Sequence, residues 1–255
     1  MNDHDIASQR RSHRIGLIVP SSNTNVEPDF QLLAPDNVTI HSVRSGGYDV
    51  DAIPDSAEMR RFVRQSIDLH VSLLRDARVD VLAYGCTSAT LSDGPEFDQS
   101  FCAELERLAE CPATTAAGAL IAGIRSVGAL RVAFTSPYVP QLRRESVAFL
   151  EQSGIQVLRD HGFDRDLNSL EQNALTPKDA YDMALAADHP DADAIVISCT
   201  DYRAVEAITA IEAAVNKPVV TSNQALMYAL LSKLGCDPRP IRQGGRLFTR
   251  EGLSK

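Results

Sequence analysis

The sequence contains no tryptophan, few other aromatic residues and only four lysines, none of them within a recognisable motif. A lysine that forms a Schiff base with pyridoxal phosphate is therefore not indicated. Neither Gly-x-Gly-x-x-Gly nor Gly-x-x-x-x-Gly-Lys-Ser/Thr occurs. These absences exclude the usual dinucleotide-binding and nucleotide-binding phosphate loops.

The chain also has no long apolar run and no excess of positive charge. A membrane span needs about 20 consecutive apolar residues, and the runs here are far shorter. The formal net charge of −9 argues against nucleic acid or an acidic membrane as a partner. Residues 1–13 are polar, so we expect a flexible N-terminal segment, no secretion signal and a cytoplasmic location.

The five cysteines form no Cys-x-x-Cys pair, and no two histidines stand three or four residues apart. A metal site is therefore not expected. An odd number of widely spaced cysteines in a chain of 255 residues is typical of free thiols in a reducing compartment. The cysteines are Cys86, Cys102, Cys111, Cys199 and Cys236.

Short apolar runs rich in β-branched residues alternate with amphipathic stretches along the chain, which predicts a doubly wound α/β protein with parallel sheets. The expected strands are residues 15–19, 79–84, 132–135, 194–198 and 219–221. The expected helices are residues 55–74, 97–108, 116–127, 141–152, 178–187, 205–215 and 225–234. Asp55, with Glu58 three residues later, is typical of the start of a helix.

Three pairs of segments repeat in the same order along the chain. They are residues 14–20 and 131–137, 80–87 and 193–200, and 112–115 and 218–221. The first pair shares Arg and Pro around an apolar run, the second shares Asp and Cys-Thr, and the third shares Pro and Thr before a helix. The repeat predicts two pseudo-symmetric α/β halves with a cleft between them. We expect one half at 14–115 with 220–255, and the other at 116–219.

Cys86 and Cys199 occupy matched positions of this repeat, each at the carboxyl end of an expected strand. Ligands of open parallel sheets bind at that end, so we expect both thiols to face one cleft. Backbone amides of a following helix would lower the pKa of each thiol and make it a nucleophile or a base. An isolated cysteine is more often a small buried apolar residue, and we interpret the three unmatched cysteines in that way.

Loops rich in hydroxyl and amide groups follow the expected strands. Pro-Ser-Ser-Asn-Thr-Asn at 20–25 is typical of an anion-binding turn, with a polar helix cap as the alternative. Thr87 and Ser88 follow one cysteine, and Thr200 and Asp201 follow the other. None of these short segments contains arginine, which favours a small carboxylate held by neutral donors.

Three further features each have two interpretations. Tyr138 either reaches the cleft or lies at the edge of the core. The polar segment 160–177, which contains Asn168 and Asn173, is either a lid over the site or a solvated loop. The Arg- and Gly-rich segment 237–255 is predicted to be a surface arm, with packing on a partner subunit as the alternative.

The motifs together resemble the aspartate/glutamate racemase superfamily, and most of all its maleate cis–trans isomerase and arylmalonate decarboxylase branch. The segments that carry the resemblance are 15–24 with Glu27, 84–88, 135–138, 198–200 and 218–223. The resemblance implies two pseudo-symmetric flavodoxin-like domains with the active site in the cleft between them. It also implies an enzyme without cofactor or metal that forms a homodimer or higher homo-oligomer.

The resemblance implies roles for the two cysteines. Cys86 corresponds to the isomerase nucleophile and Cys199 to the second catalytic thiol. Decarboxylase relatives keep only the second of these cysteines, so the presence of both counts against simple decarboxylation. The segment Thr-Asp-Tyr-Arg at 200–203 resembles racemase-type and ectoine-catabolism relatives instead, which leaves the substrate open.

Other residues correspond to the family's binding groups. Asn23 and Tyr138 correspond to carboxylate-binding residues. Asn168 corresponds to the lid asparagine, a position for which Asn173 competes. The expected substrate-binding residues are Asn23, Thr87, Ser88, Tyr138, Asn168, Thr200 and Asp201.

We therefore expect a cofactor-independent isomerase of a small dicarboxylate, most specifically one that converts maleate to fumarate. A Cys86 thiolate adduct would free the double bond to rotate, and Cys199 would act as the second acid or base. A racemase-like or decarboxylase enzyme that uses both cysteines for proton transfer is the alternative. A non-catalytic carboxylate-binding module is a third interpretation. Nucleic acid and membrane are not expected partners.

Overall fold

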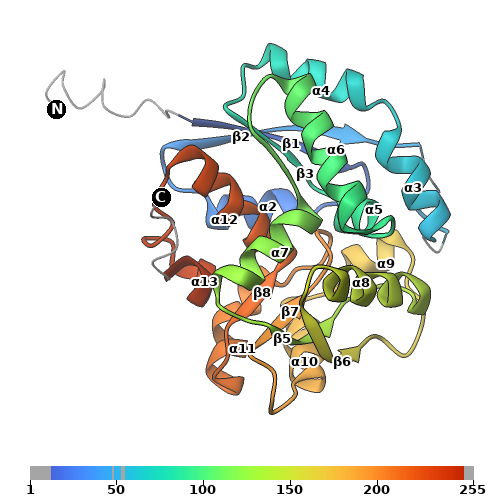
Figure 1. Cartoon of the computed structure of the whole chain (residues 1–255), viewed down its shortest axis with the longest axis vertical. Helices are drawn as coiled ribbons and strands as arrows, with labels where there is room; N and C mark the ends of the chain where they lie inside the picture. Colours follow the sequence, from blue (N-terminus) through green and yellow to red (C-terminus); the bar gives the residue numbers. More distant parts are fainter. Residues whose placement is uncertain (1–12, 48, 53–54, 250–255) are drawn as a thin grey trace, which may run out of the picture.

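Two four-stranded parallel sheets form the centre of the structure, a computed structural model that describes residues 13–47, 49–52 and 55–249. The first sheet has the order β2-β1-β3-β4 and the second has the order β6-β5-β7-β8, so the two halves have the same topology (Figure 1). Over four strands this is the order of flavodoxin-like sheets, which confirms the predicted fold class. Residues 1–12 of the expected N-terminal segment lie outside the described part of the chain.

The elements alternate along the chain as the sequence predicts. The strands are β1 (His13–Pro20), β2 (Val38–Ser45), β3 (Val81–Tyr84), β4 (Ala113–Thr115), β5 (Arg131–Thr135), β6 (Gln156–His161), β7 (Ala194–Ile197) and β8 (Val219–Thr221). The α-helices are α2 (Val26–Leu33), α3 (Ser56–Arg64), α4 (Ile67–Asp76), α5 (Thr87–Leu91), α6 (Gly94–Ala109), α7 (Ala116–Ser126), α8 (Pro140–Gln152), α9 (Ser169–Asn173), α10 (Pro177–Ala187), α11 (Ile208–Val215), α12 (Ser222–Leu234) and α13 (Gly245–Thr249). Short 3-10 helices are η1 (Val205–Ala207) and η2 (Arg242–Gly244).

Burial explains which strands the sequence reveals. The central strands β3 and β7 are buried over their whole length, because helices cover both faces of a parallel sheet. The edge strands β2 and β6 are mostly half-buried or exposed. They therefore lack an apolar run, and the sequence analysis did not predict them. It did not predict β4 either, which is buried but has only three residues, two of them threonine.

The expected helix over 55–74 is two helices, α3 and α4. Asp55 caps α3 as predicted, because its side chain accepts from the N–H of Glu58 at 2.7 Å. Ser66 then takes a left-handed conformation with φ 56° and ends the first helix. Both helices still bury the predicted apolar stripe, which consists of Met59, Phe62, Val63, Ile67, Val71 and Leu74.

The repeated Arg and Asp residues join the central strands of each half. The backbone N–H of Arg14 donates to Asp80 Oδ2 at 2.7 Å, and the N–H of Arg131 donates to Asp193 Oδ2 at 2.8 Å. Each bond ties the start of β1 or β5 to the residues just before β3 or β7. Two of the three repeated segments are therefore bonded to each other in both halves.

The helices α7 and α12 join the two halves. Each follows the last strand of its sheet, and each begins at a repeated threonine, Thr115 or Thr221, whose side chain caps the helix. α7 packs against β8 of the other sheet, and α12 packs against β3 and β4. At the crossing, a Cβ on Gly123 would lie 3.0 Å from the Cβ of Ala225, so a larger residue here would require its neighbours to shift by a few tenths of an ångström.

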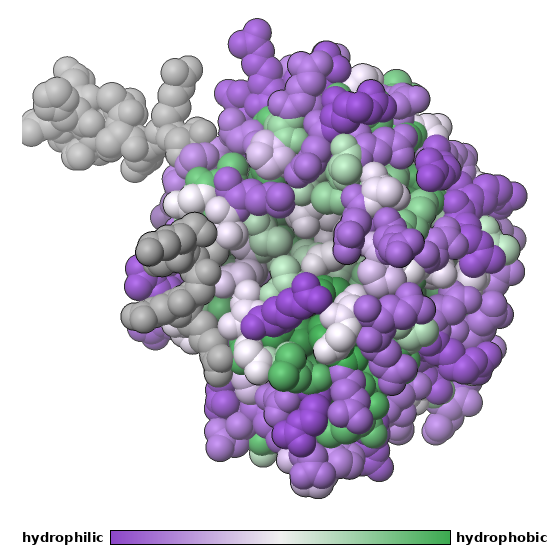
Figure 2. Space-filling model, viewed as in Figure 1, coloured by the Kyte–Doolittle hydropathy of each residue, from purple (hydrophilic) through white to green (hydrophobic). Residues whose placement is uncertain are grey.

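The core extends through both halves. Most buried apolar residues belong to one cluster that includes β1, β3, β5, β7 and β8. Figure 2 shows hydrophilic side chains over most of the viewed face, with hydrophobic ones gathered towards its centre. No described helix is both long enough and apolar enough to cross a membrane. Where the boundary between two domains falls stays a prediction.

The predicted surface arm is wrong for the described part of the C-terminal segment. Leu247 and Phe248 of α13 are fully buried, and α13 packs against β8 and α11. The backbone N–H of Arg246 donates to both carboxylate oxygens of Glu212 at 3.1 Å. The two apolar residues were overlooked because the segment around them is rich in Arg and Gly. Residues 250–255 lie outside the described part.

We predict that shortening Leu247 destabilises the protein, because it opens a cavity in the core. Leu247→Ala is expected to lower the free energy of unfolding by about 2–5 kcal/mol. Leu130→Ala removes the same atoms from a side chain that is 66% exposed, and should change that free energy by less than about 0.5 kcal/mol. Urea denaturation of both variants measures the difference. Equal effects would contradict the packing of α13 into the core.

Candidate active site

A small cavity lies at the carboxyl ends of the strands, where the two halves meet. Its volume is about 50 Å³. Since one water needs about 10–15 Å³ on this scale, the cavity suits a small molecule and is far too small for a nucleotide. It is lined by Pro20, Ser22, Asn23, Met59, Phe62, Cys86, Thr87, Ser88, Tyr138, Leu142, Ser169, Gln172, Cys199, Thr200 and Asp201.

The structure brings the two predicted thiols to this cavity. Cys86 follows β3 and Cys199 follows β7, so the matched strand ends of the two halves supply one sulfur each. All predicted site residues line the cavity except Asn168. Cys102, Cys111 and Cys236 are not among the lining residues and are half-buried elsewhere.

The loops after the two cysteines are bonded across the halves. Thr200 Oγ1 donates to the carbonyl of Gly85 at 2.8 Å, and Thr87 Oγ1 donates to Ser222 Oγ at 3.0 Å. Both threonines are almost fully buried. These hydrogen bonds fix the cysteine loops of the two halves against each other and so set the width of the cavity.

The expected lowering of the thiol pKa values is wrong in its net direction. Burial raises the pKa of both Cys86 and Cys199 above the ordinary value, and the negative charge of Asp201 raises both further. Backbone N–H groups of Ser88 and Ala89 do lower the pKa of Cys86, as the sequence predicts. The cost of desolvating a thiolate outweighs these hydrogen bonds, because both cysteine side chains are buried. Both thiols are therefore neutral in the empty cavity at neutral pH.

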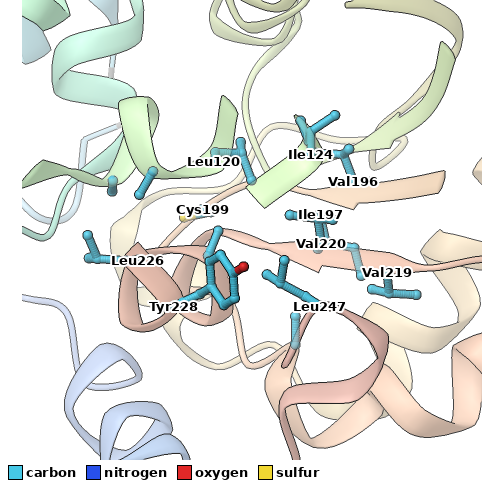
Figure 3. Packing of buried hydrophobic residues seen from close by; sticks show 14 of the residues in the cluster. Leu120, Ile124, Val196, Ile197, Cys199, Val219, Val220, Leu226, Tyr228 and Leu247 are labelled. Atoms are coloured by element: carbon cyan, nitrogen blue, oxygen red, sulfur yellow. The ribbon is translucent and has the colours of Figure 1, made fainter. Parts of the chain in front are cut away.

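Cys199 has a strained backbone. Its φ is +137°, whereas Cys86 at the matched position has an extended φ of −136°. A conformation of this kind costs about 1–3 kcal/mol in a residue with a side chain. Cys199 belongs to the same cluster of buried residues as side chains of α7, β7, β8 and α12 (Figure 3).

Asn23 belongs to the predicted anion-binding turn and lines the cavity. Its Oδ1 accepts from the N–H groups of Asn25 and Val26 at 2.9 and 3.0 Å, and its Nδ2 donates to Thr200 Oγ1 at 3.1 Å. An amide Nδ2 carries two hydrogens, so one is left for a ligand. Arg44 holds the turn from outside by donating to the carbonyl of Asn23 at 2.8 Å.

Asp201 and Tyr138 supply the other ionisable groups of the cavity wall. Asp201 Oδ1 accepts from the N–H of Thr24 at 3.2 Å and from Asn25 Nδ2 at 3.0 Å. Burial nevertheless raises the pKa of Asp201 to about 7. Burial and the neighbouring Cys199 also raise the pKa of Tyr138, so its phenol keeps its proton and remains a donor.

The polar segment 160–177 reaches the site through residues other than the predicted asparagine. Asn168 does not line the cavity, because its Oδ1 caps α9 by accepting from the N–H of Glu171 at 2.9 Å. Asn173 Nδ2 donates to the carbonyl of Ser22 at 3.0 Å and fastens α9 over the anion-binding turn. The segment thus covers the site, as one of its two interpretations expects.

Two lining residues of α9 were missed by the sequence analysis. Ser169 and Gln172 point to the cavity, and Gln172 Oε1 lies 4.0 Å from Cys199 Sγ. Their spacing of three residues places them on one face of a helix. The sequence could have indicated them, because both lie between Asn168 and Asn173 at a spacing typical of one helix face.

The wall of the cavity has donors but no cation. None of the described residues that line it is Lys, Arg or His. No group of three or more His, Cys, Asp or Glu in the described ranges could hold a metal ion. The arrangement can bind a small carboxylate through hydroxyl and amide groups and can present two thiols to it.

Known proteins resemble most of this chain. The arylmalonate decarboxylase family model matches residues 15–248. A maleate isomerase from Geobacillus stearothermophilus is 31% identical over 235 residues, which cover 87% of this chain and 91% of that protein. An arylmalonate decarboxylase from Bordetella bronchiseptica is 26% identical over 248 residues, which cover 94% and 98%.

The fold comparison agrees. The crystal structure of a variant of the maleate isomerase Iso from Pseudomonas putida S16 with maleate superposes with a TM-score of 0.85 at 32% identity. The matched parts cover 95% of this chain and 99% of that chain. The similarity therefore takes in both halves and the cleft between them.

We predict that Asp201 makes the protein less stable as the pH rises from 5 to 7. Its carboxyl is ionised over this range in the unfolded chain but protonated up to a pKa of about 7 in the folded one. The free energy of unfolding should therefore fall by about 1.4 kcal/mol for each pH unit below that pKa. Asp201→Asn removes this fall, so the variant gains relative to the wild type by about 2 kcal/mol between pH 5 and pH 7.

Asp193→Asn is the matched control for this measurement. Bonds from Arg131 lower the pKa of Asp193, so its carboxyl is ionised at both pH values and the effect of its replacement should not change. Urea denaturation of the wild type and both variants at the two pH values gives all six free energies. If Asp201→Asn had the same effect at pH 5 and pH 7, the protonated buried carboxyl would be ruled out.

Proposed function

Since this chain belongs to the arylmalonate decarboxylase family, we propose that it is a cofactor-independent isomerase that converts maleate to fumarate. The observation that carries the proposal is the pair of thiols, one from each half, on the wall of one small cavity. Decarboxylation needs one proton donor at the carbon that loses carbon dioxide. A second thiol in the same cavity supports a reaction in which one sulfur bonds to carbon and the other moves a proton.

The first step is addition of Cys86. Its thiolate forms a bond to one alkene carbon, and the π electrons move to the neighbouring carbon and into the adjoining carboxylate. The former double bond is then a single bond and can rotate. Expulsion of the thiolate after rotation gives the trans product, so the enzyme is regenerated and no electrons are lost or gained.

Cys199 handles the proton at the neighbouring carbon. Its neutral thiol gives a proton to the carbon that bears the negative charge, and its thiolate takes the same proton back before Cys86 leaves. The raised pKa of Cys199 suits this role, because the thiol holds its proton until a carbanion is present. The proton balance of the whole cycle is zero.

The Cys86 thiol must lose its proton before it can add. Asp201 in the same cavity has a pKa of about 7, so it can accept or release a proton at neutral pH. We assign to Asp201 the role of accepting the proton from Cys86 and holding it during the reaction. Tyr138 and the second Nδ2 hydrogen of Asn23 hold the two carboxylates of the substrate and stabilise the charge of the adduct. The hydroxyl groups of Thr87, Ser88 and Thr200 contribute by turning from the acceptors to which they now donate.

Several finer features belong to the same proposal. The substrate class is a small dicarboxylate, the assembly is a homodimer or higher homo-oligomer, the location is cytoplasmic and no cofactor is needed. Contact of Asn168 with the substrate stays a prediction, which requires that its side chain leave the cap of α9. A racemase-like reaction would use the same two thiols, and incorporation of solvent deuterium at the α-carbon of an amino or hydroxy acid would distinguish it.

We predict that Cys86→Ser abolishes turnover of maleate, because an alcohol with a far higher pKa replaces the attacking thiol. The rate should fall by at least about 100-fold. A proton NMR time course, which resolves the vinyl signals of maleate and fumarate, measures it. Cys111→Ser makes the same change outside the cavity and should leave the rate unchanged. A Cys86→Ser enzyme with the wild-type rate would refute the adduct mechanism.

A further inference from the structure

The strained cysteine turn is bonded by side chains that do not themselves line the cavity. Among the described residues, the other non-glycine residues with positive φ have values of 51–57°, within the ordinary left-handed region. Cys199 alone departs from it, with φ +137°. A conformation so far from the allowed regions persists only where the surroundings hold it.

The first turn of α12 forms hydrogen bonds with the N–H of Cys199 and with the carbonyl of the next residue, Thr200. Ser222 Oγ accepts from the N–H of Cys199 at 3.1 Å. Asn223 Nδ2 donates to the carbonyl of Thr200 at 3.0 Å. The two hydrogen bonds hold the backbone on both sides of Cys199. Both side chains are almost fully buried, and neither lines the cavity.

Asp29 of α2 fixes the direction of the Asn223 side chain. Its Oδ2 accepts from Asn223 Nδ2 at 2.7 Å, so the two hydrogens of that amide serve Asp29 and Thr200. Asp29 is 1% exposed, and burial raises the pKa of its carboxyl to about 7. Burial of a carboxyl group costs free energy, and the hydrogen bond with Asn223 offsets part of this cost.

The first half offers a natural comparison. The repeat aligns Thr115 with Thr221, so Ala116 and Ala117 stand where α12 has Ser222 and Asn223. Alanine side chains cannot bond a backbone turn, and Cys86 has an extended φ of −136°. The strained cysteine thus belongs to the repeat whose last helix begins with the polar pair, and the relaxed cysteine to the repeat whose last helix begins with two alanines.

We propose that Ser222, Asn223 and Asp29 are positioning residues that hold Cys199 in its strained conformation and thereby aim its thiol at the substrate. The part of this inference that concerns catalysis rests on the proposed function. The part that concerns the backbone does not. Loss of these hydrogen bonds lets the turn relax. The relaxation moves the sulfur of Cys199 and slows the proton transfer without removing any group that binds the substrate.

A thermal comparison tests the backbone part without any activity. Glycine adopts positive φ freely and alanine does not, so Cys199→Gly should melt about 2–4 °C above Cys199→Ala. At an ordinary buried position the order is the reverse. When Asn223→Ala is added to both, the advantage of glycine should vanish. The proposal is wrong if Cys199→Gly does not melt above Cys199→Ala. It is also wrong if this difference remains after Asn223→Ala, because the hydrogen bonds of Asn223 then do not maintain the strained conformation.

A kinetic comparison tests the catalytic part. Asn223→Ala and Asp29→Ala should each lower kcat for maleate by about 10- to 100-fold, because a misplaced reacting group is costly, and leave KM nearly unchanged. Asp29→Asn keeps an oxygen that accepts from Asn223 and should restore most of kcat. Ser153→Ala, which removes a hydroxyl that donates to the Phe149 carbonyl away from the cavity, should have no effect.

The two tests separate the possible failures. A wild-type protein that does not turn over maleate refutes the proposed function, while the melting temperatures still decide the backbone part. A wild-type protein that is active, with variants that change KM and not kcat, refutes positioning of the thiol. Asp29→Asn as slow as Asp29→Ala would show that the charge of Asp29, rather than its hydrogen bond, is required.

Discussion

The crossing of α7 and α12 is the constraint on which the site depends. The two helices approach so closely at Gly123 and Ala225 that a methyl group on the glycine would lie 3.0 Å from that of Ala225. Each helix starts at the last strand of one sheet and packs on the other, so the carboxyl ends of both sheets are held around one cavity. A shift of either helix would separate Cys86 from Cys199 and break the hydrogen bonds between their loops.

Desolvation governs the protonation of the ionisable groups that line this cavity. It keeps both thiols, the Tyr138 phenol and, below about pH 7, the Asp201 carboxyl protonated in the absence of a ligand. A dianion that enters meets donors and no cation among the described lining residues. Its negative charge favours the neutral form of every acid in the site, including Asp201, so the Cys86 thiolate forms only as its proton passes to that carboxylate.

The sequence predicts the fold and most of the site, because the repeat records both. The Arg and Asp of the repeat are bonded to each other in each half, and its two Cys-Thr segments line the cavity. It does not reveal Gln172, since a polar residue in a polar segment carries no pattern of its own. Nor does it reveal that Asn168 caps a helix, that α13 is buried or that Cys199 is strained, because these depend on contacts between distant parts of the chain.

The central claim is that two sulfurs from two halves act on one dicarboxylate in sequence. The most direct test is the intact mass and peptide map of Cys199→Ser protein after incubation with maleate. With the proton-transfer thiol removed, the carbanion takes a proton from solvent and no thiolate is present to remove it, so we expect a mass increase of one maleate, located on Cys86. An adduct on another cysteine, or wild-type turnover by this variant without any adduct, would contradict the claim.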